Sequence, residues 1–248
     1  MRYFLFYFLI FIPFLLLSQA RPETTVVNPQ LKVPSTHFNF RIGLGIPNGD
    51  FAADDDGIAK SGVMLEADLT KLLGNDFYLN FSIKRQSNDI NRQIINDDFK
   101  TQFQQQGISG LTITTTSIPW RVTSFMMGFG TISSINGNDI VLMTRFSLGY
   151  ADVNSPEIRT TIRDQFNNGD QIIFQNDNSG SFAFQLGLGL KINVSKETDI
   201  LLSTDYFNTQ AKFSNVGVLV NGTKVISQNF EQNISILAIS LGIAFKLD

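Results

Sequence analysis

The feature that most constrains the fold is a strict alternation of residue types in the C-terminal half of the chain. Between Phe182 and Ile192 every second residue is Phe, Leu or Ile, and the residues between them are Ala, Gln, Gly or Lys. The segment from Leu237 to Phe245 repeats this plan. Because successive side chains of a β-strand point to opposite faces, each segment has one apolar face and one small or polar face. Long alternating runs of this kind are typical of a transmembrane β-barrel.

Eight segments with this character follow one another along the chain. They cover approximately 36–46, 62–72, 77–85, 109–132, 140–151, 182–192, 199–210 and 233–247. The fourth contains Pro119, which cannot donate a ladder hydrogen bond, so we expect a bulge or bend there and assign no facing across it. The pattern predicts an all-β fold, an eight-stranded antiparallel up-and-down transmembrane β-barrel over residues 36–248.

The connections between these segments alternate between long and short. The short turns lie near Asn75, at 133–138 and around Lys196, and the last long connection has a candidate hairpin at Asn221-Gly222. Outer-membrane barrels have short periplasmic turns and long extracellular loops. We therefore expect a bacterial outer-membrane location, with four polar loops outside the cell at 48–60, 86–107, 152–179 and 211–230.

The N-terminal residues predict export. Arg2 precedes an apolar stretch over 3–17, and Ser18-Gln19-Ala20 offers small residues for cleavage, so residues 1–20 are interpreted as a signal peptide rather than as a membrane anchor. Residues 21–35 contain three prolines and are interpreted as an extended leader. The chain has no cysteine, which excludes lipoprotein attachment, disulfides and thiolate metal sites.

Several strand segments resemble a known group of proteins. The segments FAFQLGLGLKINV, SILAISLGIAFKLD and FRIGLGIPNGDF are similar to those of the small outer-membrane β-barrel proteins of Bacteroidetes-type bacteria. The resemblance covers the mature chain and rests on glycines and alternating hydrophobic residues, without a catalytic motif. It implies folding by the barrel-assembly machinery into outer-membrane lipid, and a structural, adhesive or narrowly permeative role. The C-terminal aromatic residue of such barrels is displaced here to Phe245.

The inward face carries a set of charged residues. An eight-stranded barrel is narrow and its interior is largely filled by side chains, so we favour a salt-bridged plug over a charged pore lining or gated ion path. The predicted lumen charge network consists of Arg41, Glu66, Asp68, Lys84, Arg145, Lys191 and Asp205.

Other chemistry has weak signals. His37 is the only histidine and lies at the start of the first strand, away from the long loops, so we expect no catalytic residues. The acidic run Asp54-Asp55-Asp56-Gly57 lacks the spacing of a calcium loop, and we expect no metal and no cofactor. A net charge of −3 gives no reason to expect binding to nucleic acid.

Aromatic residues of the long segments either bind an extracellular ligand or surface, or pack the loops. Two alternatives stay open: a soluble secreted β-barrel or sandwich that binds a small ligand, and an outer-membrane lipid-modifying enzyme.

Overall fold

The fold is almost entirely antiparallel β-sheet. A computed structural model describes residues 36–74, 76–136, 140–166 and 168–247, so the predicted signal peptide (1–20) and leader (21–35) lie outside the described residues. The elements are β1 (Thr36–Asn48), η1 (Gly49–Phe51), β2 (Ala59–Leu72), β3 (Phe77–Ile90), α2 (Arg92–Gln105), β4 (Thr112–Ser117), β5 (Trp120–Asn136), β6 (Ile140–Asn154), β7 (Ile158–Arg163), β8 (Gly169–Phe174), β9 (Asn178–Asn193), β10 (Thr198–Val220) and β11 (Thr223–Lys246).

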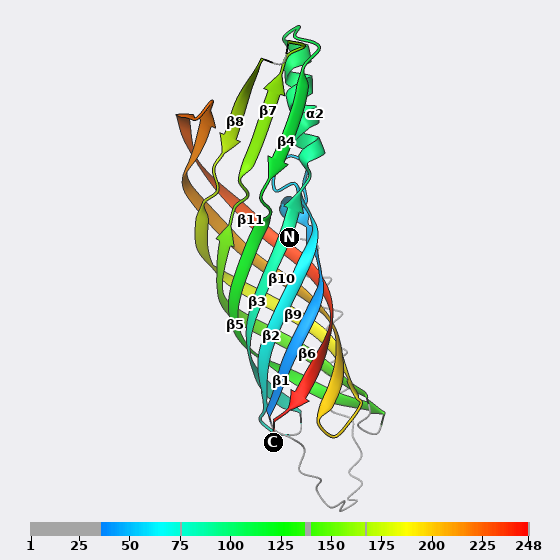
Figure 1. Cartoon of the computed structure of the whole chain (residues 1–248). Coiled ribbons are helices and arrows are strands. Elements are labelled where there is room, and N and C mark those ends of the chain that lie inside the picture. Colours follow the sequence, from blue (N-terminus) through cyan, green and yellow to red (C-terminus); the bar gives the residue numbers. More distant parts are fainter. Residues whose placement is uncertain (1–35, 75, 137–139, 167, 248) are drawn as a thin grey trace, which may run out of the picture. The chain divides into compact units, whose positions relative to one another are not determined.

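Eight of these strands form a closed ring, which confirms the predicted barrel (Figure 1). The order around the ring is β1, β2, β3, β5, β6, β9, β10 and β11, and β11 pairs back onto β1 from Lys246 opposite His37 to Ser235 opposite Asn48. Because the ring is closed, the backbone N–H and C=O groups of its strands find hydrogen-bond partners within the chain. A structure surrounded by lipid requires such internal pairing.

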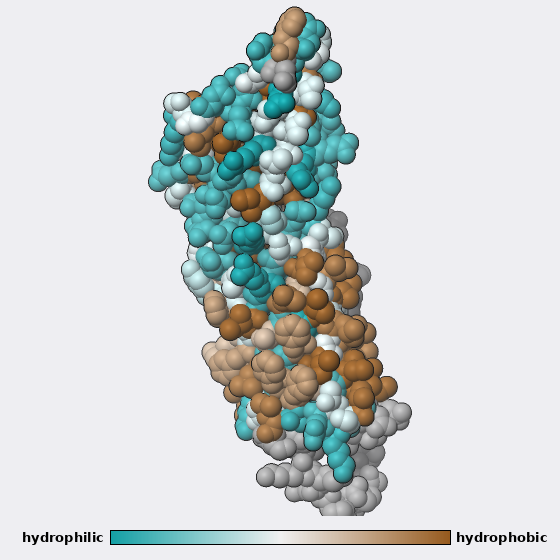
Figure 2. All heavy atoms as spheres, viewed as in Figure 1, coloured by the Kyte–Doolittle hydropathy of each residue, from teal (hydrophilic) through white to brown (hydrophobic). Residues whose placement is uncertain are grey.

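An apolar belt surrounds one part of the ring. The outward residues of β1 and β11 are exposed Phe, Ile and Leu from Phe38 to Ile46 and from Leu237 to Phe245, whereas the residues between them point inward. Figure 2 shows this belt as a brown zone, with a mainly hydrophilic surface beside it. Nine residues per strand suit a tilted membrane crossing. We call this part of the ring the belt region.

The two ends of the ring differ. One end of the ring, which we call proximal, holds Thr36, Lys246, the ends of β2 and β3 at Leu72 and Phe77, and the short turn at 194–197. At the other end lies the distal region, formed by η1, α2, β4, β7, β8 and the extended tips of β10 and β11 (Figure 1). The predicted sorting of short and long connections onto opposite ends is therefore present. The third short connection, 137–139, lies outside the described residues, and β5 continues through 133–136, which were expected to be a turn.

The prediction of one strand over 109–132 with a bulge or bend at Pro119 is wrong, because the chain is divided there into two separate strands. β4 ends at Ser117 and pairs with β7, whereas β5 begins at Trp120 and pairs with β3 and β6. The missing ladder donor of Pro119 explains why the chain leaves one sheet and enters another at this point.

The interpretation of 86–107 as a loop is wrong. β3 continues to Ile90, and α2 follows over Arg92–Gln105. Ile95, Phe99 and Phe103 are spaced four residues apart, so they share one face of the helix. Neither helix among the described residues is long and apolar enough to cross a membrane.

The prediction of loops at 152–179 and 211–230 is also wrong. The first contains the end of β6 and the hairpin of β7 and β8, and β7 pairs with β4 while β8 pairs with the tip of β10. The second is the continuation of β10 and β11, which meet at Asn221-Gly222 as the hairpin hypothesis expected. The polar and charged outward faces of these strands concealed them, because a strand flanked by water on its outer side needs no apolar residues there.

The distal region has a conventional hydrophobic core. Phe213 is 1% exposed and lies 6.0 Å from Trp120 and 4.7 Å from Phe230, measured between ring centroids. The segment 48–60, predicted as a polar loop, contributes the fully buried Phe51, whose ring contacts that of Trp120 at 5.6 Å. The Trp120 Nε1–H donates to the Gly57 carbonyl at 3.2 Å, which ties this segment across the barrel mouth.

Candidate functional site

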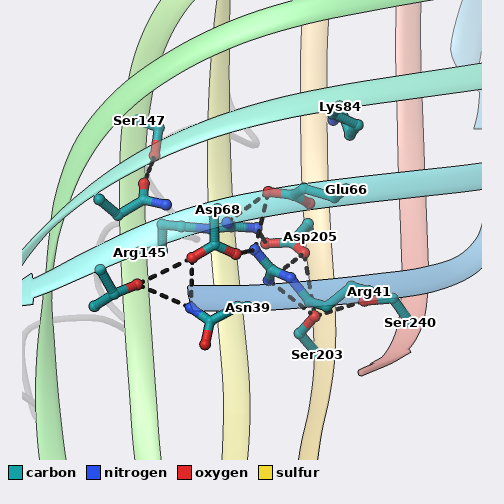
Figure 3. Close-up of polar contacts among 12 residues, drawn as sticks. Asn39, Arg41, Glu66, Asp68, Lys84, Arg145, Ser147, Ser203, Asp205 and Ser240 are labelled. Carbon is teal, nitrogen blue, oxygen red and sulfur yellow. Dashed lines mark hydrogen bonds and ion pairs between the residues drawn. The ribbon is translucent and has the colours of Figure 1, made fainter. Parts of the chain in front are cut away.

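The centre of the belt region is a cluster of buried charges (Figure 3). Arg41 on β1 lies among carboxylates from the neighbouring strand β2 and from β10. Its Nη2 donates to Glu66 Oε1 at 2.9 Å and also to Asp68 Oδ2, and its Nη1 lies 3.8 Å from Asp205 Oδ2. The register places Arg41 directly opposite Glu66, while Asp205 comes from β10, beyond β11 in the ring.

Arg145 on β6 closes the cluster from the opposite wall. Its Nη1 donates to Glu66 Oε1 at 2.7 Å and its Nη2 donates to Asp205 Oδ1 at 2.6 Å. Glu66, which is 1% exposed, therefore accepts from two guanidinium groups at one oxygen. Removing either partner would leave an uncompensated charge in a low-dielectric interior.

Polar side chains complete the proximal edge of the cluster. Asn39 Nδ2 donates to Asp68 Oδ1 at 2.5 Å and to Thr70 Oγ1 at 3.0 Å. Arg41 Nη1 donates to Ser203 Oγ at 3.3 Å, and Ser203 shares a 2.7 Å hydrogen bond with Ser240. These bonds fix the orientation of the charged groups.

Lys84 is fully buried beside the cluster and has a different environment. Its Nζ donates to Gln185 Oε1 at 3.2 Å and lies 3.8 Å from the centroid of the Phe207 ring. Phe207 belongs to the distal core, so Lys84 lies where charged lumen and apolar core meet. Figure 3 shows Lys84 apart from the ion pairs.

The predicted residue Lys191 lies elsewhere. Its Nζ is 3.6 Å from Asp199 Oδ2, and Lys246 Nζ is 2.8 Å from the other oxygen of Asp199. These three side chains form a separate group at the proximal end. The structure thus brings five predicted residues into one ion-pair network, places Lys84 next to it, and separates Lys191 from it.

The interior leaves little free space. A cavity of about 30 Å³ lies against Arg41, Asp68, Arg145 and Asp205. This is room on the scale of a water molecule, and it is too small for a solute. Three cations and three carboxylates fill the remainder of this level: Arg41, Lys84, Arg145, Glu66, Asp68 and Asp205.

The candidates for catalytic and metal-binding chemistry lie apart from the charge cluster. His37 is 3% exposed in β1 and lies between Thr70 and Lys246 in the register, at the proximal end. No group of three or more His, Cys, Asp or Glu side chains in the described part of the chain is placed to hold a metal ion. In the acidic segment, partial burial and the nearby charge of Asp50 raise the pKa of Asp56 above its ordinary value.

Sequence reasoning did not single out several members of the site. Asn39, Thr70 and Ser240 share the inward face with the charged residues, so their parity along the strands was the available signal. Gln185 and Phe207 lie directly opposite each other on the adjacent strands β9 and β10. Only the register of these two strands reveals that both side chains contact Lys84.

Comparisons with known proteins give a likeness of fold. No family model matches the chain, and no curated protein is found as a relative. Among solved structures, Neisserial surface protein A is 10% identical with a TM-score of 0.47, covering 86% of this chain and 97% of that chain. A major outer membrane protein from Thermus thermophilus is 9% identical with a TM-score of 0.46, covering 85% and 99%. Ail of Yersinia pestis is 11% identical with a TM-score of 0.41, covering 85% and 98%. At these identities and TM-scores the likeness does not extend to function.

Proposed function

We propose that this chain is an integral outer-membrane β-barrel with a closed lumen, whose distal region stands outside the cell as a structural and adhesive surface. The observation that carries the proposal is the reversal of polarity along continuous strands. The outer surface changes from apolar in the belt region to mainly polar in the distal region (Figure 2). The interior changes in the opposite sense, from charged to apolar. A soluble β-sandwich or lipocalin-like binder has no use for an exposed apolar belt.

The closed lumen argues against transport of solutes. The ion-pair cluster fills the belt region, and the core around Phe51, Trp120 and Phe213 fills the ring beyond it. Purified protein in planar bilayers should show no conductance, or only brief small openings. Large, steady, ohmic channels would assign the chain to the porins instead.

The orientation is testable because the chain has no cysteine of its own. Val225→Cys, at an exposed position of β11 near the distal tip, should react with a membrane-impermeant maleimide on intact cells. Val194→Cys, equally exposed in the proximal turn, should react only after the outer membrane is permeabilised. The reverse pattern would invert the proposed topology.

The adhesive role is favoured by a free sheet edge. β1 pairs with β11 only as far as Ser235, so residues 223–231 of β11 have β10 on one side and, among the described residues, no strand on the other. An exposed edge offers unpaired backbone donors and acceptors that an added strand satisfies. We propose that an extended segment of a partner protein pairs with this edge.

Lysines on an edge strand hinder such pairing. The double variant Val225→Lys/Ser227→Lys should reduce attachment of expressing cells to a protein-coated surface, while Asn208→Lys on the outer face of β10 should not. Attachment equal to that of the wild type in both variants would remove the edge as the contact site.

We also propose how the chain reaches the membrane and to which proteins it is related. Residues 1–20 direct secretion, the barrel-assembly machinery inserts the ring into outer-membrane lipid, and the chain is related to the Bacteroidetes-type barrels that its strands resemble. We propose no enzymatic activity and no cofactor. This is supported by the position of His37, buried in β1 at the end opposite the distal region. An unchanged lipid A composition in cells that express the protein would support it further.

A further inference from the structure

Three cationic side chains lie on the outer surface where the apolar belt ends on its distal side. On β3 the outward residue after Ile83 is Arg85, and on β5 the outward series that includes Phe125 leads to Arg121. Lys60 occupies the corresponding part of β2. All three cations are exposed. They therefore lie at the level where lipid chains give way to headgroups.

The register brings the two arginines together. Arg85 is opposite Thr123, and Arg121 is opposite Ser87, so the two arginines are diagonal neighbours on adjacent strands. Such neighbours have Cα atoms about 7–8 Å apart, within reach of long side chains for a shared ligand. Lys60 lies on the other side of β3, next to the irregularity between Ala59 and Gly62.

These cations have no charged partner in the described part of the chain. Among the described residues, none of the three forms an ion pair or a side-chain hydrogen bond, and the nearby Asp89 and Asp152 are not paired with them. At the same level the other five strands carry outward residues without positive charge: Asn48, Asp152, Asn178, Asn208 and Asn233. The positive charge is thus confined to the arc of β2, β3 and β5.

A second observation lies on the same arc. An open apolar hollow of about 560 Å³ lies on the outer face of the belt region, just proximal to the arginines. The small side chain of Ala67 lies opposite Ile83 and leaves room among larger neighbours. Its apolar lining includes Phe38, Leu69, Phe81, Ile83, Phe125 and Met127.

We propose that Lys60, Arg85 and Arg121 bind the phosphate of an anionic lipid headgroup, and that the hollow around Ala67 holds one of its acyl chains. The planar guanidinium fork matches phosphate oxygens, and Lys adds a compact point charge. Each cation near an anionic lipid surface contributes about 1 kcal/mol, which is about a fivefold change in affinity. The inference rests on the proposed function, because a headgroup layer exists only around an inserted barrel.

The test uses the folded protein in phosphatidylcholine nanodiscs with spin-labelled phosphatidylglycerol or spin-labelled phosphatidylcholine as reporters. The wild type should prefer phosphatidylglycerol, and Arg85→Gln/Arg121→Gln should lower the relative association constant by at least about fivefold. Lys100→Gln on α2, an exposed cation remote from the belt, is the matched control and should change nothing. An unchanged preference in the double variant would overturn the headgroup site.

Separate experiments test the acyl-chain hollow and the source of the phosphate. After release into detergent, mass spectrometry should find phosphatidylglycerol retained by the wild type and lost from Ala67→Phe, which fills the hollow without touching a charge. Retention by Ala67→Phe would overturn the acyl-chain seat. Calorimetry with inorganic phosphate in lipid-free detergent should show no binding, and saturable binding there would overturn the lipid assignment in favour of a free-phosphate site.

Failure of the proposed function has a different signature. A wild-type chain that does not enter nanodiscs as a heat-modifiable barrel refutes membrane insertion itself. An inserted, heat-modifiable barrel without preference for phosphatidylglycerol refutes only the lipid site.

Discussion

The belt region and the distal region are built from the same strands in opposite senses. In β10 the outward residue Leu202 faces the belt surface, and ten residues later on the same face Lys212 pairs with Glu231 in solvent. On the inner face Asp205 accepts from Arg145, whereas Phe213, eight residues further on, is buried in the distal core. The backbone and its pairing continue across this boundary.

The difference shows that the side of the strand on which a residue lies and the type of residue found there have separate causes. The two-residue period of the strand decides which side chains share a face. The surroundings decide which chemistry each face requires, because lipid favours apolar residues outside and water favours polar ones. Matched substitutions in the two regions should therefore change stability by unequal amounts.

The largest difference is expected for removal of a carboxylate. Glu66→Gln should cost about 3–5 kcal/mol of unfolding free energy, because the buried Arg41 and Arg145 lose their shared acceptor. Glu231→Gln breaks the 2.8 Å pair with Lys212, whose groups are exposed, and should cost about 0–1 kcal/mol. Denaturant titration in lipid vesicles measures both. Equal losses would mean that water reaches the lumen cluster.

When an aromatic side chain is truncated, the larger loss of stability is expected in the distal region and not in the belt region. Phe213→Ala should cost about 3–5 kcal/mol, since it empties a packed site beside Trp120 and Phe230. Phe129→Ala on the belt surface should cost less, about 1–2 kcal/mol, because this side chain is already 56% exposed and lipid chains fill the space. The same titration compares the two variants. A smaller loss at Phe213 would show that the distal core is loosely packed.

The alternation of residue types was sufficient to predict the ring but not its contacts. Because one face of each ring strand is apolar and points outward, the inward placement of Arg41, Glu66 and Arg145 follows from parity alone. That Arg41 also reaches Asp205 depends on the register around the closed ring, which no local pattern contains. Lys191 has the same parity yet lies too far toward the proximal end to join the cluster.

The distal region was predicted poorly for a physical reason. In water the outer face of a strand is polar, so β7 and β8, each of six residues, resemble loops in composition. The residues Ile95, Phe99 and Phe103 share one face of α2, but a short amphipathic stretch among Asn and Gln residues is a weak signal beside the strong strands, and the segment was predicted to be a loop. Sequence patterns are clearest where the environment is most restrictive.

An introduced cation distinguishes the two outer surfaces. Leu188→Arg should cost about 2–4 kcal/mol in bilayers, the penalty for a cation near the middle of the lipid face. Val225→Arg, at a side chain that is also exposed but in the distal region, should change stability by no more than about 0.5 kcal/mol. Stability is again measured in vesicles. If the two variants behave alike, the belt does not lie in lipid.

The smallest change in stability is expected when a glycine is replaced by alanine in one turn of each region. Gly222 at the distal hairpin has a φ of 82° and Gly74 at a proximal turn has a φ of 137°, and a Cβ at either position would meet no atom within 4 Å. Alanine at each site therefore adds only backbone strain, about 1 kcal/mol at Gly222, whose φ lies near the left-handed helical region, and more at Gly74. Hydrogen exchange should become about fivefold faster around residues 216–226 in Gly222→Ala and around the β2–β3 ends in Gly74→Ala. Each change should stay local, because Asn221 anchors the distal tip through hydrogen bonds to Asp170 and Gln171 rather than through the barrel. Faster exchange throughout the ring in Gly222→Ala would show that the two regions unfold as one unit.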